Sequence, residues 1–250
     1  MTTLIPPFLS QALAQARHIV VLTGAGISAE SGIPTFREAQ TGLWAQYDPM
    51  ELATPEAFQR NPRLVWQWYR WRRQLISNAQ PNPGHLALVK MAKATPRFTL
   101  ITQNIDNLHQ MAGSTDVLEL HGNIFRSKCF RENVLVEPWS ESEDEPPLCP
   151  HCGGPLRPDV VWFGESLPRD ILERAIAAAT SADLFFTIGT SGLVQPAASL
   201  PLMAHQAGAI TVEINPQATP LTASMSYHLA GPSGEILPQL VAAARHLTLP

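Results

Sequence analysis

Several short apolar runs in this sequence end in glycine or polar residues of the kinds that bind nucleotides. The first run, 18–22, leads into Gly24-x-Gly26-x-x-Ala29, a spacing that lets the backbone approach a pyrophosphate closely. The later runs end in Gln103, Asn104 and Asp106, then in His121, then in Gly189, Thr190 and Ser191, and finally in Asn215. A lone histidine is usually structural, but His121 ends a run and precedes a glycine, which makes it a candidate for catalysis.

The segment after the glycine loop departs from the plan of a dehydrogenase. Gly32 and Pro34 interrupt the helix that should follow the loop within two turns. The acid that holds the ribose in a dehydrogenase lies about 20 residues on, near Asp48, which does not end an apolar strand. The pattern therefore predicts a dinucleotide site without hydride transfer.

Apolar runs that alternate with helical patterns predict an α/β fold, a Rossmann-like parallel sheet with helices on both faces. The predicted strands are 18–24, 97–104, 116–122, 182–191 and 209–216, and the predicted helices are 8–17, 83–93, 169–180 and 198–208. Because ligands bind beyond the carboxyl ends of such strands, the polar residues above should meet in one crevice. Two insertions interrupt the alternation. We expect residues 1–36, 85–122 and 164–250 to form a Rossmann-like dinucleotide-binding domain, and a helical module, 37–84, to join a zinc-ribbon-like module, 123–163, in a smaller one.

The composition is that of an ordinary globular protein. The chain has 250 residues, of which 45% are hydrophobic and 15% charged, and its net charge is −4. An acidic balance argues against general nucleic-acid binding. No apolar run approaches the length of a membrane span, and the N-terminus lacks the pattern of a signal peptide. Three cysteines are an odd number and make no disulfide framework, so we expect a cytoplasmic protein.

Five stretches together resemble the signature motifs of the sirtuins, in order and in spacing. They are "GAGISAESGIPTFR", "TQNIDNLH", "ELHG", "VVWFGE" and "GTS". Sirtuins are NAD-dependent protein-lysine deacylases with a Rossmann domain and a small zinc-containing domain, and the resemblance extends from about Arg17 to Leu240. It implies that NAD is consumed as a co-substrate, which explains the departure from the dehydrogenase plan.

The resemblance also implies a role for each matched residue. His121 would be the general base that activates the ribose hydroxyls, a task that suits a pKa near 6.5, with Asn104 and Asp106 as its catalytic partners. The cofactor-binding residues would be Gly24, Ala25, Gly26, Ser28, Ala29, Phe36, Arg37, Trp44, Gln103, Asn104, Ile105, Asp106, Gly189, Thr190, Ser191, Asn215 and Ser233. From the residues alone, Asp106 could instead cap the helix that follows it.

A Trp-rich segment, 61–76, carries the clue to the acyl group. Asn61 is a predicted N-cap with Pro62 at the first helical position. Leu64, Trp68, Trp71 and Leu75 form one stripe, interpreted as the core face. Tyr69 and Arg72 lie three apart on the neighbouring stripe and offer a hydroxyl and a guanidinium suited to a carboxylate.

This Tyr-x-x-Arg pair resembles that of sirtuins which remove succinyl, malonyl or glutaryl groups. Ala53 matches a small residue that widens the acyl pocket in that class. The alternative is that Arg72 pairs with a structural acid such as Glu51 or Glu56, or extends to water. We expect acetyl groups to be accepted as well.

The acylated peptide should bind as an added strand, because main-chain pairing tolerates many sequences. The resemblance places this strand between Val161, Phe163, Gly164 and Glu165 on one side and Gly192, Leu193 and Val194 on the other. The valine and phenylalanine side chains could equally belong to the core.

The zinc site of the family is incomplete in this sequence. Cys149-x-x-Cys152 has the spacing of a zinc knuckle, and Cys129 lies upstream, but Glu132 stands where a fourth cysteine belongs. Glu132 or His151 could supply the fourth ligand. Alternatively the site is empty and the cysteines are small buried hydrophobic residues.

Two other functions stay open beside the deacylase. An ADP-ribosyltransferase or plain NAD hydrolase could use the same fold. A non-catalytic NAD-sensing module would be favoured if His121, Asn104 or Asp106 were replaced, and none of them is.

Overall fold

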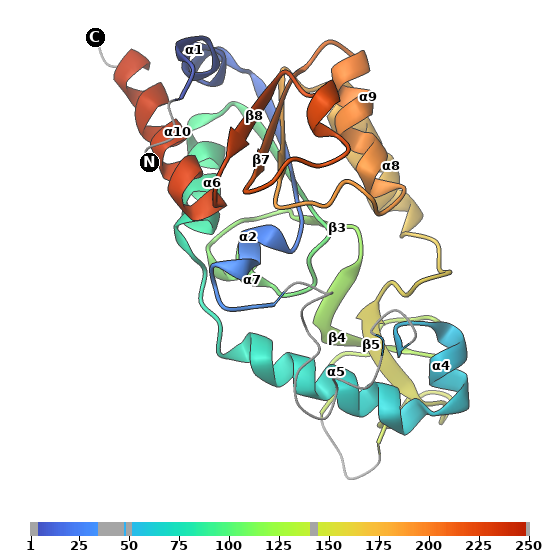
Figure 1. Cartoon of the computed structure of the whole chain (residues 1–250). Helices are drawn as coiled ribbons and strands as arrows, with labels where there is room; N and C mark the ends of the chain where they lie inside the picture. The colour runs from blue at the N-terminus through green and yellow to red at the C-terminus, as the bar shows by residue number, and fades with distance from the viewer. Residues whose placement is uncertain (1–4, 35–47, 49–51, 141–144, 249–250) are drawn as a thin grey trace.

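Six parallel strands form the large sheet of this protein, in a computed structural model that describes residues 5–34, 48, 52–140 and 145–248 (Figure 1). The strands are β1 (His18–Thr23), β2 (Arg97–Thr102), β3 (Leu118–Glu119), β6 (Leu184–Ile188), β7 (Ile210–Asn215) and β8 (Tyr227–Ala230). Their order is β3-β2-β1-β6-β7-β8, so the order reverses between β1 and β6. The structure confirms the predicted α/β class, with this reversal as its topological switch point.

Helices cover both faces of the sheet because alternate strand residues point to opposite sides. Ile19 and Val21 pack against α1 (Pro7–Gln15), α6 (Pro83–Ala94) and α10 (Ser233–Thr248). Val20 and Leu22 pack against α8 (Arg169–Thr180), the turn η2 (Ala197–Ser199) and α9 (Leu200–Gln206) on the other face. Buried on both sides, β1 reads in the sequence as a continuous apolar run.

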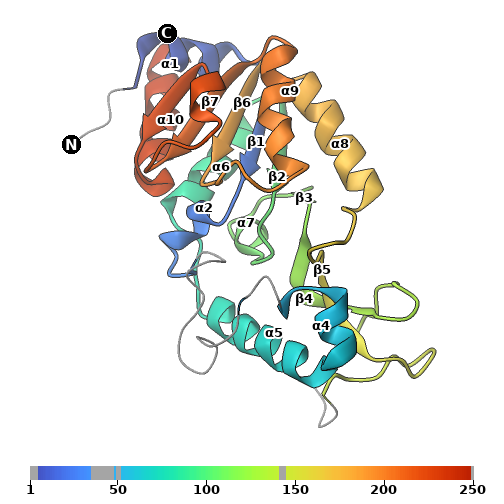
Figure 2. The same ribbon diagram turned by 45° about the vertical axis from the view of Figure 1, so that its right-hand side comes forward.

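A second lobe lies below the carboxyl edge of the sheet (Figures 1 and 2). It contains α4 (Pro55–Arg60), the long α5 (Pro62–Ser77) and an antiparallel pair, β4 (Gly122–Cys129) and β5 (Leu156–Val160). The Asn61 side chain accepts a hydrogen bond of 3.1 Å from the Leu64 amide, which confirms the predicted N-cap. Short elements complete the chain: α2 (Gly26–Ala29), α7 (Leu108–Met111) and η3 (Thr222–Ser224).

The predicted core stripe of α5 is wrong at one end. Leu75 is 43% exposed, whereas Val65, Tyr69 and Ile76 of the neighbouring stripe are buried together with Trp68. The buried face is rotated because α5 packs against α4 on one side and against β4 and β5 on another. Only the tertiary neighbours of the helix decide which of two adjacent apolar stripes is covered.

In the part of the molecule that contains the large sheet, β8 and α10 were not predicted from the sequence. The strand is short, and three of its four residues are partly or fully exposed, so it lacks a continuous apolar run. The helix carries an internal proline, Pro238, which argues against a helix in a sequence. The predicted domain boundaries remain a prediction. Within the described residues, no helix is both long and apolar enough to cross a membrane.

Candidate functional site

Three glycines join β1 to β6 at the switch point, and we call Gly24, Gly26 and Gly189 the glycine cradle. The Gly26 amide donates a hydrogen bond of 2.9 Å to the carbonyl of Gly189. A Cβ atom on Gly26 would lie 2.6 Å from the Cα of Gly189, and one on Gly189 would lie 2.5 Å from the nitrogen of Ile27. The backbones therefore pack directly against each other, at the place where an open α/β sheet binds its ligand.

Ser28, Asn104 and Asp106 form a hydrogen-bonded group beside the cradle. Ser28 Oγ donates to Asp106 Oδ2 at 2.7 Å, and Asn104 Nδ2 lies 3.1 Å from both Ser28 Oγ and the Gly24 carbonyl. Asp106 Oδ1 also accepts a hydrogen bond of 3.0 Å from the Leu108 amide at the start of α7, whose N-cap residue is Asn107. Burial raises the pKa of Asp106, against these hydrogen bonds. The hydrogen bond to the start of α7 therefore uses only one of the two carboxylate oxygens of Asp106.

His121 follows β3 and has a defined proton arrangement. Its Nδ1 lies 2.9 Å from the carbonyl oxygen of Gln103, so Nδ1 carries the proton and Nε2 keeps its lone pair. Burial lowers the pKa of His121, with the hydrogen bond to Gln103 acting in the opposite direction. A neutral imidazole with a free Nε2 at neutral pH can accept a proton.

The remaining nucleotide-site candidates line the same edge of the sheet. Asn215 Nδ2 donates to the Thr190 carbonyl at 2.7 Å, and Ser191 Oγ accepts from the Leu193 amide. Ser233 begins α10 and donates to Glu30. Ala25 precedes α2, and Ala29 is its last residue. The Ile105 carbonyl accepts a hydrogen bond from the Ile124 amide. Three predicted residues lie outside the described part of the chain: Phe36, Arg37 and Trp44.

Two buried histidines, His85 and His109, lie in contact behind these residues, and the sequence did not predict this contact. The rings of His85 and His109 have centroids 4.9 Å apart, and His109 Nε2 lies 2.9 Å from Thr23 Oγ1. Thr23 donates to Thr102, which in turn accepts from the Asn104 amide, so the pair supports Asn104. Burial lowers the pKa of His85 to about 4 and that of His109 to about 3. His85 also closes the capping box of α6 with Asn82.

The predicted acyl-recognition residues meet in the lower lobe. Tyr69 is buried, and its hydroxyl accepts a hydrogen bond of 2.9 Å from Trp162 Nε1. The Arg72 guanidinium lies 5.0 Å from the ring centroid of Trp68 and 5.8 Å from that of Tyr69. Ala53 is buried in the same cluster, and its carbonyl accepts from the Phe163 amide. Burial lowers the pKa of Arg72, and the electrostatic effects of Tyr69 and Asp106 oppose this shift.

Arg157 braces the loop after β5, and no sequence pattern marked it. It is 2% exposed, donates to both oxygens of Glu165 at 2.5 and 2.9 Å, and donates to the Val160 carbonyl. The Glu165 side chain, predicted to face substrate, is therefore held by Arg157 and by the Trp162 amide.

The two segments predicted to flank the peptide expose apolar side chains. Phe163 is 40% exposed, Leu193 53% and Val194 39%. The Val161 amide is taken by the His121 carbonyl. Gly164 and Gly192 both adopt positive φ, at 87° and 67°.

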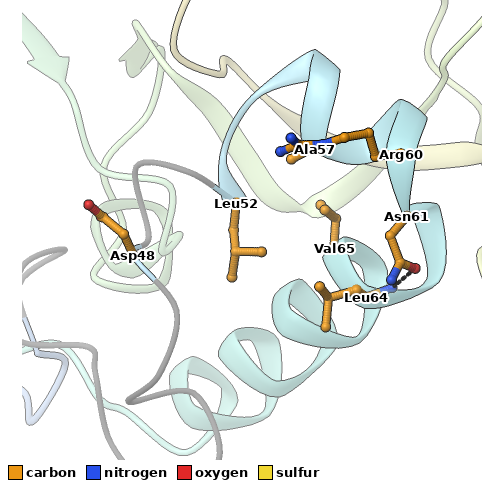
Figure 3. A pocket seen from close by; sticks show the side chains of 7 residues that line it. All are labelled: Asp48, Leu52, Ala57, Arg60, Asn61, Leu64 and Val65. Carbon is orange, nitrogen blue, oxygen red and sulfur yellow. Dashed lines mark hydrogen bonds between the residues drawn. The ribbon is translucent and has the colours of Figure 1, made fainter.

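A separate cavity of about 160 Å³ lies between Asp48 and the start of α5 (Figure 3). Leu52, Ala57, Leu64 and Val65 line it together with the exposed Asp48, Arg60 and Asn61. In the figure the Leu52 side chain stands between Asp48 and the side chains of Leu64 and Val65 on α5.

The three cysteines and Glu132 form one cluster on the turns around β4 and β5. Their ligand atoms all lie within 4.8 Å of one another, and Cys129 Sγ is 3.4 Å from Cys152 Sγ. A tetrahedral zinc with bonds of about 2.3 Å places sulfurs roughly 3.8 Å apart. The donor set therefore fits a structural zinc. Of the two predicted fourth ligands, Glu132 belongs to the cluster found among the described residues and His151 does not.

Comparisons with known proteins give a consistent result. Residues 24–196 match the Sir2 family. The NAD-dependent protein deacylase of Aquifex aeolicus is 57% identical over 212 residues, 84% of this chain and 88% of that protein. NAD-dependent protein deacylase 1 of Pseudomonas aeruginosa is 50% identical over 237 residues, 92% of this chain and 95% of that protein.

Solved structures agree. A complex of a Sir2 homologue with NAD has a TM-score of 0.91 and 46% identity, and the match covers 98% of this chain and 96% of that one. A Sir2 protein bound to an acetylated peptide has a TM-score of 0.82 and 32% identity, with 93% and 95% covered.

Proposed function

Since the chain belongs to the Sir2 family and is an NAD-dependent protein deacylase of the sirtuin type, we propose that it removes acidic acyl groups, succinyl or malonyl, from lysine side chains. Acetyl groups are substrates as well. The products are free lysine, nicotinamide and O-acyl-ADP-ribose. The observation that carries the acyl preference is the pairing of Tyr69 and Arg72 on one face of α5, within a buried aromatic cluster.

The chemistry of this assignment begins at the nicotinamide ribose. The acyl carbonyl oxygen attacks C1′, nicotinamide leaves, and an alkylimidate forms. His121 Nε2 then takes the proton of a ribose hydroxyl, which attacks the imidate carbon. The C–N bond to lysine breaks as the amine takes up a proton, and a water molecule adds to the same carbon to give O-acyl-ADP-ribose. The hydrogen bond from Nδ1 to the Gln103 carbonyl supports this role because it stabilises the protonated imidazole.

The glycine cradle and the strand ends bind NAD in this proposal. The backbone at Gly24, Ala25 and Gly189 lies close to the phosphates, with Thr190, Ser191, Asn215 and Ser233 toward the adenosine half. Asp106 binds the nicotinamide carboxamide, and Asn104 orients the ribose or a water. The shared hydrogen bonds of Ser28, Asn104 and Asp106 support a single preorganised site.

The peptide adds a strand between residues 161–165 and 192–194. The exposed side chains of Phe163, Leu193 and Val194 support this placement, since they offer apolar surface on both sides of the added strand. One Sir2 protein of known structure is bound to an acetylated peptide, and another structure holds Sir2 with a p53 peptide and NAD+.

The acyl carboxylate lies against Tyr69 and Arg72, with the small Ala53 leaving room for the longer chain. A guanidinium and a phenol together suit a carboxylate, because one supplies charge and the other a directed hydrogen bond. The alternative partner Glu51 lies outside the described residues, and Glu56 is an exposed residue of the first turn of α4.

Glu132 is the fourth ligand of a structural zinc beside Cys129, Cys149 and Cys152 in this proposal. The metal links the turns before β5 to the end of β4 and contributes folding free energy. Metal analysis of purified protein tests the ligand set. We expect one zinc per chain in the wild type and in His151→Ala, and less than one in Glu132→Ala; an equal zinc content in Glu132→Ala excludes the glutamate as ligand.

Mass spectrometry of the products tests the acyl assignment. Wild type, Arg72→Met and His121→Ala are incubated with NAD and with acetyl- and succinyl-lysine peptides of one sequence. We expect O-succinyl-ADP-ribose from wild type, a lower succinyl-to-acetyl ratio from Arg72→Met, and no turnover from His121→Ala. An unchanged ratio in Arg72→Met makes Arg72 structural. NAD hydrolysis without peptide turnover moves the function to an NAD hydrolase.

A further inference from the structure

The Tyr69 hydroxyl has a fixed direction that the Tyr-x-x-Arg pair alone does not explain. A phenol can accept hydrogen bonds through its oxygen lone pairs but has a single proton to donate. In this structure Trp162 Nε1, which can only donate, lies 2.9 Å from the Tyr69 oxygen in a buried environment. The indole therefore occupies an acceptor position of the phenol and leaves its proton for another partner.

Trp162 is itself held firmly. Its amide donates to Glu165 Oε2 at 2.8 Å, and the Arg157 guanidinium stacks 3.3 Å from the centroid of its ring. Phe58 packs against the same ring with centroids 5.4 Å apart, and the side chain is only 2% exposed. An indole with so many fixed contacts cannot turn away without breaking them, so the direction of its N–H is preset.

Burial also keeps the phenol protonated. It raises the pKa of Tyr69, with the Arg72 charge opposing the rise. A neutral phenol beside a guanidinium can donate to an anion, and a phenol that already accepts one hydrogen bond is polarised toward stronger donation.

We infer that Trp162 is a positioning residue for acyl selectivity: its indole N–H turns the Tyr69 hydroxyl so that the phenol proton points to the carboxylate of a succinyl or malonyl group. This inference rests on the proposed function. It explains why the Tyr69 hydroxyl, which accepts a hydrogen bond from Trp162, acts as a donor toward the acyl group. An acyl group that ends in a methyl offers no acceptor and gains nothing from this arrangement.

The test compares three peptides of one sequence that carry acetyl-, butyryl- or succinyl-lysine. Butyryl has the chain length of succinyl without the carboxylate, and therefore controls for pocket size. We expect Trp162→Phe to lower the succinyl-to-butyryl ratio of kcat/KM about fivefold and Tyr69→Phe to lower it about tenfold, the size expected for a hydrogen bond to a charged group. The loss should appear in KM for the succinyl peptide.

The double variant separates positioning from packing. Because Trp162 acts through the Tyr69 hydroxyl, Trp162→Phe should not lower the ratio further once Tyr69 is phenylalanine. Additive effects, or equal losses on all three peptides, overturn the inference. If Trp162→Phe does not fold, benzothienylalanine at 162 replaces the N–H by sulfur in the same shape and gives the same readout.

An Arg72→Met arm distinguishes the two failures. If Arg72→Met lowers the succinyl ratio and neither replacement of Trp162 does, the inference fails and the proposed function stands. If Arg72→Met leaves the ratio unchanged, the proposed acyl preference fails and the inference fails with it.

Discussion

The glycine cradle and the aromatic cluster around Tyr69 are built from opposite materials. In the cradle, backbone packs against backbone. The Gly26 amide donates to the Gly189 carbonyl, and neither residue has room for a Cβ. In the cluster, the contacts join side chains of distant segments, since Tyr69 and Trp162 are 93 residues apart in the chain.

This difference explains why the glycine cradle can be predicted from the sequence and the contacts of the aromatic cluster cannot. A close approach of two backbones permits only glycine, so residue type and spacing disclose the cradle. A side-chain cluster can be built from many residue types, and its function depends on which polar atoms face each other. The comparison predicts that the cradle tolerates no added atom, whereas the cluster depends on individual polar partners.

The largest effect is expected from Gly189→Ala. The new Cβ would lie 2.5 Å from the Ile27 nitrogen, and φ is +61°. Strain at positive φ and overpacking together should lower the free energy of unfolding by about 4 kcal/mol and raise KM for NAD. Urea denaturation checks this against Gly113→Ala, where φ is +101° and nothing lies within 4 Å. Equal losses in both variants would show that crowding in the cradle contributes nothing.

Next comes Arg157→Met in the lower lobe. The change leaves the Glu165 carboxylate without its buried partner and removes the cation stacked on Trp162. We expect a loss of about 3 kcal/mol. The control is Arg169→Met, since the exposed pair of Arg169 and Glu173 should contribute less than about 0.5 kcal/mol. Similar denaturation midpoints for the two variants contradict the idea that the cluster depends on individual polar partners.

Acid should destabilise the protein through a pair of buried histidines, His85 and His109, which lie behind the glycine cradle. Both pKa values lie below the unfolded value of 6.5, at about 4 for His85 and about 3 for His109. Below pH 6.5 the unfolded chain takes up protons that the folded chain refuses, so the free energy of unfolding falls as the pH drops toward 4. His85 alone should account for about 2 to 3 kcal/mol.

Urea titrations between pH 7 and pH 4.5 measure this loss. His109→Gln removes one of the two groups and keeps a side-chain donor for Thr23, so its stability should depend less steeply on pH than that of wild type. Parallel curves for the two proteins exclude His109 as a source of acid sensitivity.

The smallest effects test which face of α5 is covered. Ile76 is buried in the cluster, whereas Leu75 is 43% exposed. Ile76→Ala should cost about 2 kcal/mol, and Leu75→Ala less than about 0.5 kcal/mol. Thermal or urea unfolding of the two variants checks this, and the opposite order restores the stripe predicted from the sequence.

The sequence predicted five strands of the sheet, most of the helices and the start of α5 at Asn61 and Pro62. Each rests on a local cause: a continuous apolar run for a strand buried on both faces, or a capping side chain followed by proline. It missed β8, which lies partly exposed, and α10, which contains Pro238. The local sequence signals for β8 and α10 are weak, and both elements are stabilised by their packing and pairing with the rest of the sheet.

Residue types and their spacing alone predicted the close approach of the cradle glycines and the gathering of polar strand ends beside it, because only glycine permits the backbone contact and parallel strands bring their ends to one edge. The tertiary structure decided everything that depends on facing atoms. It chose Glu132 over His151 in the cysteine cluster, paired Arg157 with Glu165, and placed the Trp162 N–H on the Tyr69 hydroxyl. The physical reason is that the role of a polar side chain depends on the group to which it hydrogen-bonds. These partners come from segments that the chain brings together only by folding.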